Sequence, residues 1–223
     1  MKKLLSTLVA MALIAPMACA GFARADTILG STTIPSGSAP GTCGTARVIN
    51  QVTSDPSIPY AAPGNGTITQ WQTNTTGSTP GSPVMLVALR PVGASFSVVG
   101  VDSRVLPTPA PSGGIATFPI ASPIAVAAGD TLGLYANGSA VNCFYSGGAT
   151  SLAATLAALG APSPPGPGQT LSRLFGDSPA GFTMNLAANF APAPPHKKKC
   201  KKKKKKRSAE SAKKKKCKKK KKK

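Results

Sequence analysis

The distribution of lysine most limits what this chain can fold into. Nineteen of its 21 lysines lie in residues 197–223, and none lies between Lys3 and Lys197. A run of this kind repels itself and has almost nothing apolar to bury, so it cannot form a core. We therefore expect residues 197–223 to be a disordered, lysine-rich tail, and any folded domain must come from the residues before it.

The net charge of +21 describes this tail and not the rest of the protein. Residues 196–223 carry +19, whereas residues 26–195 carry four arginines against five aspartates. Attraction to polyanions is therefore expected from the tail alone. The basic side chains predicted to bind polyanions are Lys197, Lys198, Lys199, Lys201, Lys202, Lys203, Lys204, Lys205, Lys206, Arg207, Lys213, Lys214, Lys215, Lys216, Lys218, Lys219, Lys220, Lys221, Lys222 and Lys223.

Residues 1–25 have the pattern of a secretory signal peptide. A basic start precedes an apolar run at residues 4–15, and small-x-small sites end at Ala20 and Ala25. The run is too short to span a membrane. We expect cleavage after Ala25, with Ala20 as the alternative. A lipid anchor on Cys19 is disfavoured because the residues before it form a poor lipobox. The protein is therefore expected to be secreted.

Cys43 and Cys143 are the two cysteines of the region between signal and tail. Disulfides persist in oxidising compartments, so we predict a Cys43–Cys143 bond, with two buried free thiols as the alternative. Cys200 and Cys217 occupy equivalent places in a repeated ten-residue lysine run. Neighbouring lysines favour the reactive thiolate, which makes both tail cysteines candidates for crosslinking, within one chain or into a disulfide-linked oligomer.

Residues 26–190 are predicted to form one all-β domain. Glycine and proline together make up about a fifth of the chain, which argues against long helices. Alternating or continuous apolar runs predict eight or nine strands in a β-sandwich of jelly-roll or Greek-key type. The clearest are at residues 67–73, 84–92, 95–101, 114–120, 124–127, 131–136, 140–145 and 181–190.

Three shorter segments complete the predicted organisation. Residues 151–159 (SLAATLAAL) favour a single short helix. Asn137 and Gly138 form a pair typical of tight turns, because both residues tolerate a positive φ. Residues 191–196 form a proline-rich linker that leads into the tail.

The composition excludes most catalytic chemistry from the predicted domain. The single histidine, His196, lies at the junction with the tail, so a Ser–His–Asp or Cys–His site within the domain is excluded. The domain also lacks lysine and glutamate. We therefore expect a non-enzymatic protein without a metal or cofactor; a glycosidase built on two aspartates is the formal alternative.

Several residues have both a functional and a structural interpretation. Trp71 is a possible ligand platform for a sugar ring, but a lone tryptophan in a sandwich strand more often belongs to the core. Asp130 can be a calcium ligand or a turn residue, and we favour the turn. Tyr135 and Tyr145 can form an exposed aromatic pair, although packing between strands is the ordinary outcome.

Four strings of residues carry a resemblance to a known group. They are residues 68–73 (ITQWQT), 89–93 (LRPVG), 98–100 (VVG) and 128–135 (AGDTLGLY). In these strings the chain, over residues 26–223, resembles a group of uncharacterised exported β-sandwich proteins of high-GC Gram-positive bacteria, some of which also end in Cys-containing lysine runs. The resemblance implies the fold and the export, and it implies no activity or site.

Together these features predict an exported, non-enzymatic β-sandwich module that its polylysine tail anchors to anionic cell-envelope polymers or a lipid surface. The first alternative is a carbohydrate- or ligand-binding module. The second is an extracellular nucleic-acid-binding protein, which predicts binding that depends steeply on salt and has no sequence preference. The tail has no aromatic residues, so base stacking is not expected. A third interpretation is a solubilising charge run without a partner.

Overall fold

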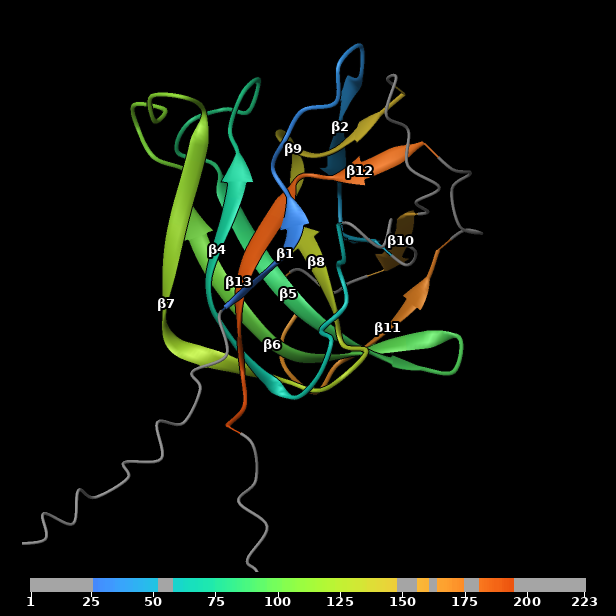
Figure 1. The fold of residues 1–223 in the computed structure, drawn as a ribbon. Helices are drawn as coiled ribbons and strands as arrows, with labels where there is room; N and C mark the ends of the chain where they lie inside the picture. Colours follow the sequence, from blue (N-terminus) through green and yellow to red (C-terminus); the bar gives the residue numbers. More distant parts are fainter. Residues whose placement is uncertain (1–25, 52–57, 148–155, 161–163, 175–180, 195–223) are drawn as a thin grey trace, which may run out of the picture. The chain divides into compact units, whose positions relative to one another are not determined.

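The computed structural model describes residues 26–51, 58–147, 156–160, 164–174 and 181–194 (Figure 1). Their secondary structure consists of strands and turns, which confirms the all-β prediction. Within these residues there is no helix long and apolar enough to cross a membrane. The strands are β1 (Thr27–Ser31), β2 (Ala39–Gly44), β3 (Arg47–Gln51), β4 (Gly66–Asn74), β5 (Pro83–Val92), β6 (Ser95–Val105), β7 (Ile115–Val126), β8 (Thr131–Tyr135), β9 (Gly138–Ser146), β10 (Leu156–Gly160), β11 (Thr170–Arg173), β12 (Phe182–Met184) and β13 (Leu186–Pro192).

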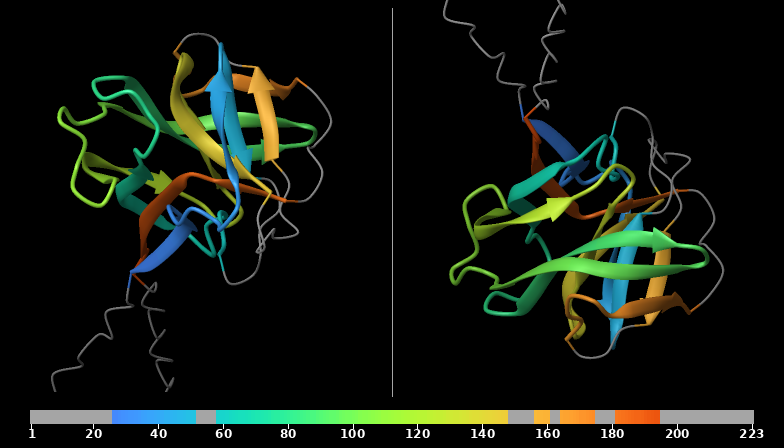
Figure 2. Two further views of the ribbon diagram at one scale, coloured as in Figure 1. Left: turned by 90° about the horizontal axis from the view of Figure 1, so that it is seen from above. Right: turned by 90° about the horizontal axis from the view of Figure 1, so that it is seen from below.

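The described strands form three antiparallel arrangements. One is a four-stranded sheet in the order β1-β13-β4-β7, the second is a closed barrel in the order β10-β11-β6-β5-β8-β3, and the third is a three-stranded sheet in the order β12-β9-β2. In both views of Figure 2 the long green β5 and β6 lie with the light-blue β3, apart from the dark-blue β1. The predicted single sandwich did not include this barrel.

Strand β5 shows why the chain needs two cores. Its residues from Val84 to Leu89 are all buried, although successive side chains point to opposite faces. Leu86 packs in the interface core, to which the four-stranded sheet, the three-stranded sheet and the outside of the barrel all contribute buried side chains. Val87 and Leu89 pack in the barrel core, which fills the inside. A strand that is buried on both faces has an uninterrupted run of apolar residues, and the sequence of β5 has such a run from Val84 to Leu89.

Two glycines mark places where backbone approaches a core side chain closely. A Cβ on Gly133 of β8 would lie 2.6 Å from the Val48 side chain within the barrel core. A Cβ on Gly100 of β6 would lie 2.5 Å from Ile124 of β7, where sheet and barrel meet. Distances this short leave no room for even a methyl group, so glycine is required by packing at both positions.

The predicted helix over residues 151–159 is wrong for its second half. Residues 156–160 form β10, while residues 151–155 lie outside the described residues. All five residues of β10 pair with β3, and two of them also pair with β11. Leu159 is fully buried in the barrel core. The pairing that closes the barrel therefore overrides the helix propensity of alanine and leucine.

The predicted strand at residues 181–190 is divided in the structure. β12 ends at Met184 and pairs with β9, whereas β13 begins at Leu186 and pairs with β1 and β4. Asn185 lies at the crossing, fully buried. β13 then continues through Pro192, so the first two residues that we assigned to the linker belong to the sheet.

Two further boundaries differ from the prediction. The segments predicted at residues 114–120 and 124–127 form a single strand, β7, which is irregular opposite Ile68–Gln70. β7 is an edge strand of its sheet and contains Pro119 and Pro123. The Asn137–Gly138 turn joins β8 of the barrel to β9 of the three-stranded sheet, so it moves the chain between sheets and does not close a hairpin.

Candidate functional site

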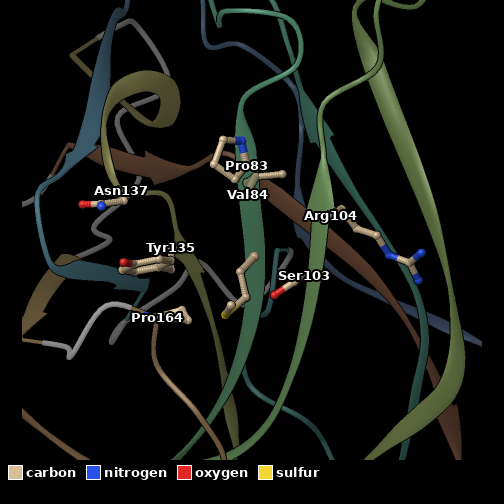
Figure 3. Close-up of a pocket in the computed structure, with 8 residues that line it drawn as sticks. Pro83, Val84, Ser103, Arg104, Tyr135, Asn137 and Pro164 are labelled. Atoms are coloured by element: carbon tan, nitrogen blue, oxygen red, sulfur yellow. The ribbon is translucent and has the colours of Figure 1, made fainter.

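A hollow of about 270 Å³ lies at one mouth of the barrel (Figure 3). It forms where β5 and β6 run on beyond the short strand β11, whose pairing with β6 extends over Ser95–Ser97 only. The inner faces of β5 and β6 therefore continue past the part of the barrel that β11 covers. We call this hollow the barrel-mouth pocket. Its lining residues are Pro83, Val84, Met85, Ser103, Arg104, Tyr135, Asn137 and Pro164.

Strand pairing places three of the lining residues in one row. Met85 of β5 lies opposite Ser103 of β6 on one side and opposite Tyr135 of β8 on the other. Met85 and Tyr135 are buried and also belong to the barrel core. Ser103 is exposed, as are Pro83, Asn137 and Pro164. The pocket therefore has a buried floor of thioether and aromatic ring, and a rim of small side chains.

The charged side chain among the lining residues turns away from the pocket. The Arg104 guanidinium donates to Asp102 Oδ2 at 2.8 Å and to the carbonyl of Pro119 on β7. In Figure 3 its end is directed away from Ser103 and Tyr135, whereas the Ser103 hydroxyl is directed towards the same space as the Tyr135 ring. The described lining can therefore present a hydroxyl group and an amide group to a ligand, but no ionised group.

The predicted disulfide is present. Cys43 of β2 and Cys143 of β9 are bonded, with their Cα atoms 5.2 Å apart, and both residues are buried. The bond closes a separation of 100 residues and joins two paired strands. Both cysteines belong to the interface core, so the bond has a structural role.

Trp71 is a core residue and not an exposed platform. Its side chain is fully buried, its ring centroid lies 4.6 Å from that of Phe118, and its Nε1 donates to Asp102 Oδ2 at 2.7 Å. No ring face is left for a sugar, which overturns the ligand-platform hypothesis for this residue. The structural interpretation, that a lone tryptophan in such a strand is core, is confirmed.

Asp130 also has the structural role that we favoured. Its carboxylate receives two hydrogen bonds from Arg90, at 2.8 and 2.7 Å, and a third from the backbone N–H of Ala127. These bonds fix the turn before β8 and leave the carboxylate 2% exposed. The neighbouring carboxylate raises the pKa of the Arg90 guanidinium. Among the described residues no three His, Cys, Asp or Glu side chains gather as a metal site would require.

The tyrosines do not form an exposed pair. Tyr135 and Tyr145 are both buried, in agreement with ordinary packing between strands. Burial raises the pKa of Tyr145, whose hydroxyl has no hydrogen-bond partner among the described residues. Both side chains therefore contribute to packing, and Tyr135 alone reaches the pocket.

The remaining predicted site residues lie outside the described residues. These are the tail lysines and Arg207, together with Cys200 and Cys217. Conversely, the sequence did not point to Met85, Ser103 or Asn137 as neighbours. The one indication was the continuous apolar run of β5, which shows two buried faces but not where one of them becomes uncovered.

Comparisons of the chain with protein-family models, with curated proteins and with solved structures found no match. The resemblance to exported β-sandwich proteins therefore stays a prediction. Function has to be inferred from the charge distribution and from the geometry of the described residues.

Proposed function

We propose that this protein is an exported, non-enzymatic β-domain held at the cell surface by electrostatic binding of its lysine-rich tail to anionic envelope polymers. The observation that carries the proposal is the separation of charge along the chain. Residues 197–223 hold 20 basic side chains against one acidic side chain, whereas residues 26–195 have a net charge of −1.

The described part of the domain supports this division. Arg90 is paired with Asp130 at 2.7 Å, and Arg104 is paired with Asp102 at 2.8 Å. In each pair the positive charge of the arginine is balanced by the negative charge of the aspartate, so neither pair attracts a polyanion strongly. A basic residue near an anionic lipid surface contributes about 1 kcal/mol of attraction, so a run of this density supplies the binding. Ionic strength screens such attraction, which makes it testable with salt.

The test is co-sedimentation of the mature protein with envelopes from the producing cell across a salt series. The matched control keeps the full length of the chain but replaces the 19 tail lysines with glutamine. We expect the natural protein to sediment at low salt and to be released as salt rises, while the glutamine variant stays in solution. Sedimentation of the glutamine variant to the same extent would show that the β-domain itself binds the envelope.

Two further arms identify the polyanion and the oligomeric state. Envelopes treated with a nuclease separate binding to extracellular nucleic acid, the alternative polyanion, from binding to envelope polymers or lipid. Non-reducing electrophoresis of the sedimented protein tests crosslinking through Cys200 and Cys217: we expect dimers or larger ladders, and a monomer throughout would contradict it.

A further inference from the structure

We propose that the barrel-mouth pocket binds the end of an uncharged alkyl or acyl chain. This inference is independent of the tail, because it depends on the lining of the pocket alone. Ligand sites are typically apolar hollows with a few convergent polar groups, and this pocket has that composition. Its floor is formed by Met85 and Tyr135, and its rim includes Pro83 and Pro164.

The apolar surface continues beyond the pocket. Val105, the last residue of β6, pairs with Pro83, the first residue of β5. Its side chain is 61% exposed, the largest exposed fraction among the exposed large apolar side chains of the described residues. A single exposed valine needs no explanation, but one next to an apolar hollow enlarges the surface that a ligand can cover.

The charge of the lining selects the class of ligand. Arg104 is the charged residue among those that line the pocket, but its guanidinium is held away from the pocket by Asp102 and by the Pro119 carbonyl. A carboxylate or phosphate placed in this pocket would lose water without gaining a counter-charge there, which is costly. Ser103 and Asn137 can hydrogen-bond a hydroxyl, ether or ester oxygen at the rim.

The depth of the pocket selects how much of the ligand enters. Beyond Met85 the barrel is filled by side chains of its own core, including Val87, Val98 and Leu171, all at most 1% exposed. The volume of about 270 Å³ lies just below the usual range of sites that enclose a whole drug-sized ligand. The pocket therefore suits the end of a chain, and the unbranched side chain of Met85 can adapt to it.

The experiment measures displacement of N-phenyl-1-naphthylamine, an uncharged fluorescent probe, from the full mature protein by 1-butanol, 1-hexanol, 1-octanol and 1-decanol. We expect saturable binding of the probe at one site. The affinity of the alcohols should rise with chain length and then level off when the chain outgrows the pocket. An affinity that rises without levelling, or probe binding that does not saturate, would overturn the proposal.

A pair of exposed serines supplies matched variants. Ser103→Trp places a large ring at the rim of the pocket, whereas Ser122→Trp makes the same change on the exposed edge strand β7. We expect at least tenfold weaker probe binding for Ser103→Trp and no change for Ser122→Trp. Equal affinities in the two variants would contradict the proposal. Asn137→Asp, also at an exposed position, adds a charge to the rim and should weaken binding by about threefold.

Vesicles of phosphatidylcholine distinguish binding to the acyl chain of a membrane lipid from binding to a free amphiphile in solution. They carry no net charge, so the tail has no electrostatic reason to bind them. Sedimentation of the natural protein with these vesicles, and its loss in Ser103→Trp, would identify a lipid as the source of the chain. Binding of the alcohols without sedimentation would identify a free amphiphile.

Discussion

The interface core and the barrel core share β3, β5 and β8 but differ in the side chains that fill them. The interface core contains Trp71, Tyr60 and the Cys43–Cys143 bond. The Trp71 indole donates to Asp102 of the barrel strand β6, and the Tyr60 hydroxyl donates to the carbonyl of Met184 in β12. The barrel core is smaller, mostly aliphatic, and leads to the barrel-mouth pocket. The difference indicates that one core fixes the fold, whereas the other has an end that a ligand can reach.

Two leucines of β5 compare the cores most directly. Leu86 and Leu89 are both 0% exposed, the first in the interface core and the second in the barrel core. We expect Leu86→Ala to lower the free energy of unfolding by about 4 kcal/mol and Leu89→Ala by about 3 kcal/mol, because a smaller core can relax more around a cavity. Urea denaturation measures both. A larger loss for Leu89→Ala would reverse the comparison.

Mutation of Asn185 tests how much the buried hydrogen bonds next to the interface core contribute to stability. Its side chain accepts from the N–H of Asn74 and donates to the carbonyls of Asn74 and Asn142, at 2.7–2.8 Å. Asn185→Ala removes three hydrogen bonds of buried groups, so we expect a loss of about 3 kcal/mol in the free energy of unfolding. Asn189→Ala, at a half-buried position of β13, is the control and should cost far less.

A smaller effect is expected at Trp71. Trp71→Phe keeps an aromatic ring in the interface core but removes the hydrogen bond to Asp102, which also accepts from Arg104. A hydrogen bond to a charged group contributes about 1.5–3 kcal/mol, and we expect a loss near the lower value because Asp102 keeps its second donor. Thermal unfolding measures it. If the variant also lost envelope binding without losing stability, Trp71 would have a functional role after all.

The smallest effect is a dependence on alkaline pH. Burial raises the pKa of Tyr60 in the interface core far above its ordinary value of 10.0, and burial also raises that of Tyr145. Unfolded chains therefore lose these protons first. Stability should be unaffected by these groups below pH 10 and should fall as the pH rises above it. Urea midpoints from pH 8 to pH 11 measure the fall, which Tyr60→Phe should reduce; an unchanged slope would show that Tyr60 is not responsible.

The part of the fold that depends on local pattern could be predicted from the sequence. The apolar run at residues 84–92 and the alternation at residues 67–73 correspond to β5 and β4. The disulfide could be predicted because Cys43 and Cys143 are the two cysteines between the predicted signal peptide and the predicted tail. These features are determined by a few neighbouring residues or by the amino-acid composition, so the sequence alone is enough to predict them.

The part of the fold that depends on pairing between residues far apart in the sequence could not be predicted. β10 forms a strand because β3 and β11 lie on either side of it, although its own residues favour a helix. Asn185 gives no local indication that the chain changes sheets there. The pocket forms because β11 is shorter than β6 and pairs with only part of it. The sequences of the two strands do not show where this pairing ends.

The prolines of β7 have a consequence for the surface attachment that we propose, which would gather many copies of the domain together. Exposed strand edges invite other chains to add to a sheet, and crowding makes such addition faster. Pro119 and Pro123 have no N–H to donate, and they lie on the edge strand of the four-stranded sheet. At the β7 edge, a strand from another copy would therefore find two fewer backbone donors to pair with, which makes this edge a poor place for one copy to add to the next.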